Sequence, residues 1–316
     1  MDKHEHQDGH RGRPRPGPGK GHGLGGKGDA ARRKHHLTPI PGPGAKGRAP
    51  GQPTRSTQAN AKAVPTSWDN VAAWYDRLVG ETGSDYHRNV LLPTAMDMLA
   101  PRPGVRILDL CCGQGVLSRM LAGAGAQVVG VDASSALVSA ARARGGGAGL
   151  EYAVADARNL GPMADGRFDA AVCLMAVHDL DDVEAAIGGM ARALRPGGQA
   201  VVIMMHPCFR IPRQSSWGWD GQRKIQYRRL DRYASALTVP ISAHPGSDPS
   251  QHTVFFHRPI GAYINAMGRA GLAVVECREL LSHRRSEPGG RSRAENRARD
   301  EFPVFLALRA LKLPTQ

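Results

Sequence analysis

The residues Asp109-Leu110-Cys111-Cys112-Gly113-Gln114-Gly115 form a short glycine-containing loop between an apolar segment and an amphipathic one. Glycine at positions 113 and 115 lets the backbone turn tightly and approach a ligand that a Cβ atom would push away. The helix expected after the loop offers free N–H groups at its N-terminus. A dinucleotide site of the G-x-G-x-x-G type would need glycine at 118, where the chain has Ser118. The loop therefore predicts a ligand site without the pyrophosphate signature.

Two acidic residues follow the next two apolar segments of the chain. Asp132 stands 19 residues after Gly113, the spacing at which a carboxylate accepts both hydroxyls of an adenosine ribose. Asp156 follows a third apolar segment within Ala155-Asp156-Ala157. Each acid alone is often only a helix cap. In this order, at one edge of one sheet, the loop and the two acids indicate a site for an adenosine-containing ligand.

Two histidines stand where later strands are expected to end, His178 after Met175 and His206 after Met205. Ligands of open α/β sheets bind beyond the carboxyl ends of the strands, and a histidine there can take a proton near neutral pH. His178 and His206 are therefore the candidate catalytic bases, with a hydrogen-bonded structural role as the alternative. The spacing of His206, Cys208 and His244 matches no metal-ligand template, so no metal site is predicted.

Residues 206–258 are rich in Pro, Gly, Trp, Arg and Tyr and contain no long periodic run. This segment is expected to cover a substrate. Aromatic and basic side chains together suit an aromatic or anionic small molecule, and the candidate substrate contacts are Trp217, Trp219, Tyr227 and Arg210. The same combination can stack nucleic-acid bases. A lid whose aromatic side chains only pack on the domain is the third interpretation.

The elements that must position these residues alternate between strand and helix patterns. Helices are expected at 67–78, 86–99, 116–124, 135–144, 183–194 and 260–270, and strands at 105–110, 127–131, 150–154, 168–175, 199–205, 253–257, 272–277 and 303–311. The last of these strands is expected to follow a polar loop. Short, continuous apolar strands separated by helices favour an α/β fold with a parallel sheet covered on both faces.

With these motifs the chain resembles the class I S-adenosylmethionine-dependent methyltransferases over roughly Trp68 to Lys312. The resemblance implies a Rossmann-like sheet of seven strands with helices on both faces, and helices in residues 66–100 that close over the cofactor. The residues it implies for binding S-adenosylmethionine are Asp109, Cys111, Gly113, Gln114, Gly115, Asp132, Ala133, Asp156, Ala157, Met175 and Tyr75. Among them the loop would hold the methionine part, Asp132 the ribose and Asp156 the adenine amino group. The chain departs from the family at Cys111, where a glycine is usual.

The function implied by the resemblance is methyl transfer by in-line displacement to a small-molecule acceptor, in a core similar to that of the ubiquinone and menaquinone methyltransferases. Such a reaction mainly needs donor and acceptor to be aligned and water to be excluded. An RNA methyltransferase is the alternative, because of the basic tail and the Arg-aromatic segment. A regulatory module that binds the cofactor without turnover is the second alternative. The acceptor atom and the oligomeric state are not predicted.

Residues 1–65 hold 13 Lys/Arg against 4 Asp/Glu, which is +9 of the formal net charge of +14. Gly, Pro and His dominate there and few large apolar residues are present, so a disordered basic tail is expected, with residues 66–316 as the methyltransferase domain. Weak nucleic-acid contact through the tail is an open alternative. No apolar stretch of 18 residues and no secretory signal are seen, and the five cysteines show no C-x-x-C spacing, so a reduced, cytoplasmic location is expected.

Overall fold

The computed structural model describes residues 66–242 and 252–314. The predicted tail over 1–65 therefore lies outside the described residues, and so does His244. Among the described residues, no helix has the length and apolar character needed to cross a bilayer.

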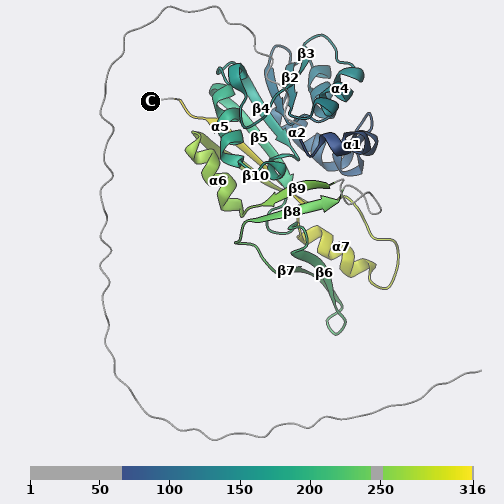
Figure 1. The fold of residues 1–316 in the computed structure, drawn as a ribbon. Coiled ribbons are helices and arrows are strands. Elements are labelled where there is room, and N and C mark those ends of the chain that lie inside the picture. The colour runs from purple at the N-terminus through teal and green to yellow at the C-terminus, as the bar shows by residue number, and fades with distance from the viewer. Residues whose placement is uncertain (1–65, 243–251, 315–316) are drawn as a thin grey trace, which may run out of the picture. The chain divides into compact units, whose positions relative to one another are not determined.

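A seven-stranded sheet in the order β10-β11-β5-β4-β1-β2-β3 forms the centre of the fold (Figure 1). Its strands are β1 (Arg106–Leu110), β2 (Gln127–Asp132), β3 (Leu150–Val154), β4 (Phe168–Leu174), β5 (Leu194–Met205), β10 (Leu272–Leu280) and β11 (Phe305–Lys312). β1 to β5 are paired in parallel, while β11 runs antiparallel to both β5 and β10. The predicted α/β sheet is confirmed, with its carboxyl ends of β1, β2, β4 and β5 at one edge.

Helices cover both faces of the sheet because the residues of each central strand alternate between two cores. Ile107 packs with the side chains of α2 and α3, and Leu108 packs with those of α5 and α6. The helices are α1 (Ala72–Val79), α2 (Leu92–Leu99), α3 (Val116–Gly123), α4 (Ser135–Ala143), α5 (Val183–Ala193), α6 (Ile260–Arg269) and α7 (Ser292–Glu301). Short helical turns add η1 (Asp69–Val71), η2 (His87–Leu91), η3 (Gly161–Met163) and η4 (Val177–Asp179).

Two antiparallel hairpins occupy the segment between β5 and α6. β6 (Ser215–Asp220) pairs with β7 (Ile225–Leu230), and β8 (Leu237–Ser242) pairs with β9 (His252–His257). β6, β7 and β8 were not predicted, because β6 and β7 mix polar with aromatic residues over a few positions, and the alternation in β8 is interrupted by Pro240, which is typical of a loop or an edge strand. The segment before β11 was expected to be a polar loop, but it contains α7, which buries only Ala298 and lies beside the β6–β7 hairpin (Figure 1).

Candidate functional site

The loop between β1 and α3 is held in a left-handed bend by the end of β2. Cys111, Gly113 and Gly115 have φ values of 54°, 57° and 81°. The Gly113 amide donates to Asp132 Oδ2 and the Ser134 amide donates to Asp132 Oδ1, both at 2.9 Å. Burial raises the pKa of Asp132, while these two amide hydrogen bonds oppose the shift. One buried carboxylate thus fixes the loops after β1 and β2 together.

Tyr75, from α1, lies over this bend. A Cβ atom on Gly113 would approach Tyr75 Cε1 at 3.2 Å, so the ring packs directly against the glycine. The Trp68 ring meets Tyr75 edge-on, with ring centroids 5.2 Å apart. Burial, and then the charge of Asp132, raise the pKa of the Tyr75 hydroxyl well above its ordinary value. The structure therefore brings Tyr75 to the loop and to Asp132, while its predicted contact with the cofactor stays a prediction.

Asp109 and Gln114 shape the loop from inside the protein. Asp109 Oδ2 accepts the Ser118 hydroxyl of α3 at 2.6 Å, and burial raises the pKa of Asp109 to about 7 against the effect of that bond. Gln114 Nε2 donates to the Gly80 carbonyl at 2.6 Å, which ties the loop to the end of α1. Both side chains are almost fully buried. In this geometry they position the loop, and any ligand contact of Gln114 falls to its backbone.

Asp156 lies at the end of β3 but is engaged by an arginine. Arg158 Nη2 donates to Asp156 Oδ2 at 2.7 Å, and its Nη1 reaches Asp181 Oδ1 at 2.5 Å. The bond to Arg158 lowers the pKa of Asp156, with burial opposing it. Ala157 is buried in the core beside α5, so only its backbone faces the edge of the sheet. If Asp156 binds the adenine amino group as predicted, its carboxylate accepts hydrogen bonds from both the adenine and Arg158.

The two candidate histidines differ in what their ring nitrogens contact. His206 Nδ1 accepts the Cys208 amide at 3.2 Å, and Nε2 lies 2.9 Å from Glu279 Oε1, so both nitrogens have partners. His178 Nδ1 is buried and has no hydrogen-bond partner among the described residues. Burial lowers the pKa of His178 to about 3. His178 thus keeps one ring nitrogen unbonded among the described residues, but the burial of that ring makes it a weak base near neutral pH.

Asp179 is a residue that the sequence reasoning did not select, although it follows His178 directly. Burial raises the pKa of Asp179 well above its ordinary value. Its Oδ1 lies 4.0 Å from His178 Nε2, and its charge also raises the pKa of Tyr75. Phe255 of β9 closes the other side of His178, with ring centroids 4.8 Å apart. The end of β4 thus presents a dehydrated carboxyl and an imidazole beside Tyr75. The signal available in the sequence was an acidic residue directly after a histidine at the expected end of a strand.

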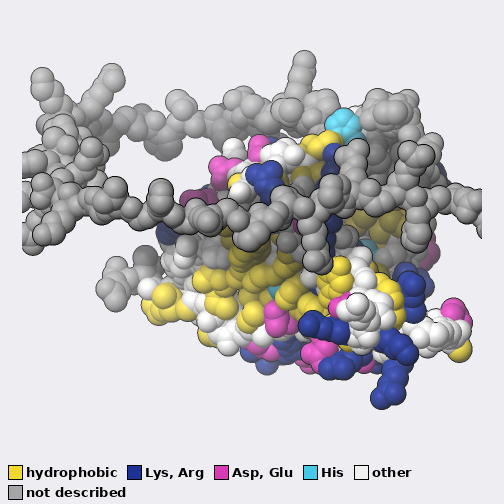
Figure 2. Space-filling view, turned by 90° about the horizontal axis from the view of Figure 1, so that it is seen from below, with side chains coloured by type: hydrophobic (Ala, Val, Ile, Leu, Met, Phe, Trp, Pro, Cys, Tyr) yellow, Lys and Arg dark blue, Asp and Glu magenta, His cyan; other side chains and the backbone are white. Residues whose placement is uncertain are grey.

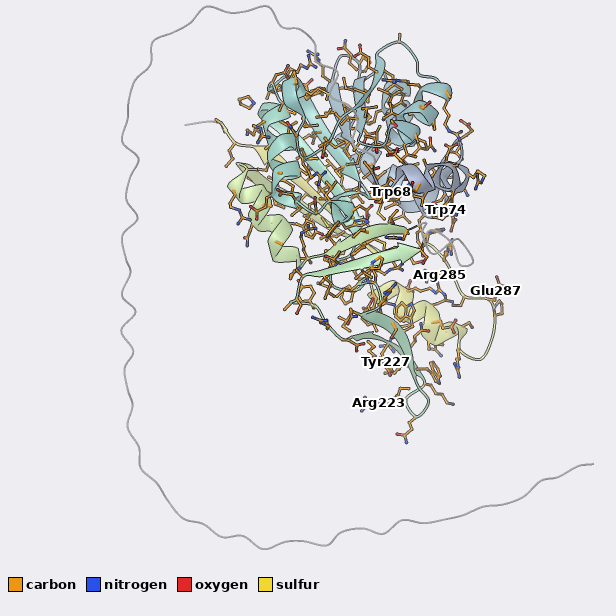
Figure 3. The ribbon with its side chains drawn as sticks, in the orientation of Figure 1. Trp68, Trp74, Arg223, Tyr227, Arg285 and Glu287 are labelled. Atoms are coloured by element: carbon orange, nitrogen blue, oxygen red, sulfur yellow. The ribbon has the colours of Figure 1, made fainter. Side chains whose placement is uncertain are left out.

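The residues predicted to contact a substrate separate into two places. Arg210 and Trp217 line one pocket at the end of β5. Trp219 lies under Arg291 of α7, 4.8 Å from the guanidinium carbon to the ring centroid. Tyr227 is largely exposed on the β6–β7 hairpin, at the side away from the sheet (Figure 3). The described residues contain no cluster of three His, Cys, Asp or Glu side chains that could hold a metal ion.

Comparison with known proteins gives concordant findings. Residues 108–202 match the family model described as a methyltransferase domain. The chain is 36% identical over 151 residues to a 2-phytyl-1,4-naphtoquinone methyltransferase of Synechococcus elongatus, covering 46% of this chain and 64% of that one. It is 34% identical over 136 residues to a ubiquinone biosynthesis O-methyltransferase of Xanthomonas oryzae, covering 42% and 57%. The chain thus matches less than two thirds of the length of these curated relatives.

A solved structure gives broader coverage. The crystal structure of an S-adenosylmethionine-dependent methyltransferase from Mesorhizobium loti is 30% identical in sequence and has a TM-score of 0.55. The likeness covers 69% of this chain and 96% of that chain.

Proposed function

Since the chain belongs to the S-adenosylmethionine-dependent methyltransferases, we propose that it transfers a methyl group from S-adenosylmethionine to a small-molecule acceptor. The observation that carries this proposal is the glycine loop at residues 113–115. The buried carboxylate of Asp132 holds this loop, and the ring of Tyr75 packs against it. The names of the naphthoquinone and ubiquinone relatives point to small molecules, and we extend that class of acceptor to this chain.

The residues present fit such a donor. Gly113 has no Cβ atom, which lets Tyr75 approach the backbone of the loop closely, and Asp132 keeps lone pairs free beside its two amide bonds for the ribose hydroxyls. Met175, with a φ of 58° at the end of β4, lies at the same edge of the sheet. When bound, S-adenosylmethionine supplies a methyl group on a positively charged sulfur. The protein's part is to hold it in line with an acceptor and to exclude water.

We assign the proton of an O–H or N–H acceptor to the pair at the end of β4. Asp179 is the base of this pair, because burial raises its pKa and so strengthens its carboxylate as a proton acceptor. His178, whose pKa is lowered to about 3, accepts a hydrogen bond at its unbonded Nδ1. Removing water from around these groups strengthens their interaction with a nearby proton. His206, with both nitrogens bonded, is assigned to holding the turn after β5 through Cys208 and Glu279.

Label transfer tests the proposal. The full-length protein is incubated with methyl-labelled S-adenosylmethionine and with either the small-metabolite fraction or the RNA fraction of a cell extract. We expect label in a small molecule, together with release of S-adenosylhomocysteine, and loss of both in Asp132→Ala but not in Asp165→Ala, an exposed acid. Label confined to RNA would support an RNA methyltransferase, and donor binding with no labelled product would support a regulatory module. Either result would refute the proposal.

We also propose a reducing compartment, the cytoplasm, as the location of the protein. All five cysteines are free, including Cys111 and Cys173, whose thiols contact each other without a disulfide. Thiol titration of denatured protein from its native source should give five free thiols. Fewer than five would contradict the assignment.

A further inference from the structure

A pocket at the carboxyl end of β5 gathers basic and aromatic side chains without an acid. It is lined by Tyr86, Phe209, Arg210, Trp217, Arg228, Ser282, Arg299, Phe302, Pro303 and Val304. Three of these residues are arginines and none is acidic. They come from the residue before η2, from β6, β7 and α7, and from the loops after β5, after β10 and before β11, so the fold collects them from distant parts of the sequence. On the face that Figure 2 shows, hydrophobic side chains likewise adjoin Lys and Arg side chains.

The arginines in the pocket are not neutralised by the protein. Arg228 donates from Nε to the Phe209 carbonyl at 2.8 Å and from Nη2 to the Ser215 hydroxyl at 2.7 Å. The Arg210 guanidinium makes no hydrogen bond or ion pair with another described residue, although Arg210 is only partly exposed. Arg210 and Arg228 line the same pocket, and burial, followed by the charge of Arg210, lowers the pKa of Arg228. Two like charges placed together at low dielectric are unfavourable unless an anion joins them.

Flat aromatic surfaces surround the charges. Arg228 lies over the Trp217 ring at 5.0 Å, and Trp217 meets the Phe302 ring at a centroid distance of 5.6 Å. Phe209 meets Phe302 at 5.5 Å. Because these rings meet edge to face, each can still pack against the ring of a ligand. The pocket therefore has a planar apolar part and a cationic part side by side.

The pocket lies at the edge of the sheet where the donor site is placed. Tyr86 packs on Phe305 at a ring distance of 5.3 Å, and Phe305 pairs with Met205 at the end of β5. Tyr86, Phe305 and Met205 share one hydrophobic cluster with Met175 at the end of β4. Tyr86, which lines the pocket, therefore packs in the same hydrophobic cluster as Met175 at the end of β4.

We propose that this pocket binds the acceptor, and that the acceptor carries a planar ring and an oxyanion group, a carboxylate or a phosphate, held by Arg210 and Arg228. Arg299, whose Nη2 also reaches the Ser286 hydroxyl at 3.2 Å, adds a third charge from α7. Guanidinium groups donate two parallel hydrogen bonds to carboxylate and phosphate, which gives the ligand a fixed orientation. This inference rests on the proposed function for the role of the ligand as acceptor, but not for its binding.

Calorimetry with small probes tests the proposal on the full-length protein, with and without S-adenosylhomocysteine. The probes are phenyl phosphate, benzoate, phenol and inorganic phosphate. We expect phenyl phosphate or benzoate to bind at least ~10-fold more tightly than phenol, because a charge-assisted contact is lost in phenol. Inorganic phosphate should also bind more weakly than phenyl phosphate, because it lacks the ring. Binding should quench the fluorescence of Trp217.

Variants locate the site. Arg210→Gln should weaken phenyl phosphate binding at least ~10-fold, and Arg210→Lys should restore part of it. Arg229→Gln is the matched control, since Arg229 neighbours Arg228 but pairs with Asp231 outside the pocket. The side chain of Arg210 makes no hydrogen bond within the described part of the chain, so Arg210→Gln should keep the thermal unfolding temperature of wild type.

Three results would overturn the proposal: equal affinity for phenol and phenyl phosphate, unchanged affinity in Arg210→Gln, or Arg210-dependent binding of a single-stranded RNA oligomer without binding of the small anions. Binding of S-adenosylhomocysteine without the anion would refute this pocket and leave the methyltransferase proposal standing. Anion binding at Arg210 without S-adenosylhomocysteine binding would refute the methyltransferase proposal instead.

Discussion

The Tyr152 hydroxyl lies against the backbone of Gly115 and donates to its carbonyl at 3.3 Å. A Cβ atom on Gly115 would come within 2.2 Å of that hydroxyl, and the residue has a φ of 81°. Position 115 therefore excludes every side chain for two independent reasons, one from the backbone and one from β3.

We expect Gly115→Ala to reduce the free energy of unfolding by about 2 kcal/mol or more, since the left-handed backbone alone costs about 1–2 kcal/mol. Denaturant unfolding measures this. Gly147→Ala, in an exposed loop with no atom within 4 Å of the added Cβ, should change stability by less than about 0.5 kcal/mol. Adding Tyr152→Phe to Gly115→Ala should recover part of the loss. An unchanged stability in Gly115→Ala would contradict the packing described.

Cys111 occupies a left-handed backbone position at which the related proteins usually have glycine. We expect Cys111→Gly to keep the affinity for S-adenosylhomocysteine and to change the free energy of unfolding by no more than about 1 kcal/mol, because relief of the backbone offsets the lost thiol contact with Cys173. Cys111→Val should lose both binding and stability, because a β-branched side chain is an outlier at positive φ. Cys277→Val, at an exposed cysteine, is the control. Equal behaviour of the two Cys111 variants would refute the interpretation.

Burial of His178 makes stability depend on pH. Its folded pKa of about 3 lies below the ordinary 6.5, so the unfolded chain binds more protons between these values. His178 therefore makes the free energy of unfolding rise with pH across this window, by at most about 1.4 kcal/mol per pH unit, and the contribution is lost as the pH falls. Asp179, whose pKa is raised, contributes with the opposite sign above pH 3.8.

The free energy of unfolding is measured for wild type and His178→Gln between pH 4.5 and 6.5. The difference between the two slopes against pH is the contribution of His178, at most about 1.4 kcal/mol per pH unit. The variant should show the shallower rise with pH, and His252→Gln, at an exposed histidine, should follow wild type. A steeper rise in His178→Gln than in wild type would show that His178 is charged in the folded protein.

The sheet and the loop after β1 could be predicted because short apolar strands and positive-φ glycines leave local signals. Cys111 was kept in the loop because it is small, and it does adopt the left-handed conformation. Other features depend on residues distant in sequence. Arg158 forms ion pairs with both Asp156 and Asp181. His206 contacts Glu279 of β10 and the Cys208 amide in the turn after β5. Neither set of contacts could be predicted from the spacing of residues in the sequence.

The pocket at β5 was predicted only in part for the same reason. Arg210 and Trp217 stand close together in the sequence, but Arg299 lies on α7, whose charged residues show no apolar face and were expected to form a loop. The place of Trp219 under Arg291 likewise depends on where α7 packs. Periodicity predicts the elements with a buried face and fails for elements that are polar on every side.

Binding of S-adenosylhomocysteine to wild type and Asp132→Ala by titration calorimetry tests the central claim most directly. Asp165→Ala serves as the control, and thermal unfolding confirms that each variant is folded. We expect wild type and Asp165→Ala to bind equally, and Asp132→Ala to bind at least about tenfold more weakly, since hydrogen bonds to a charged group contribute about 1.5–3 kcal/mol. No heat of binding with wild type, or equal affinity in Asp132→Ala, would contradict the account.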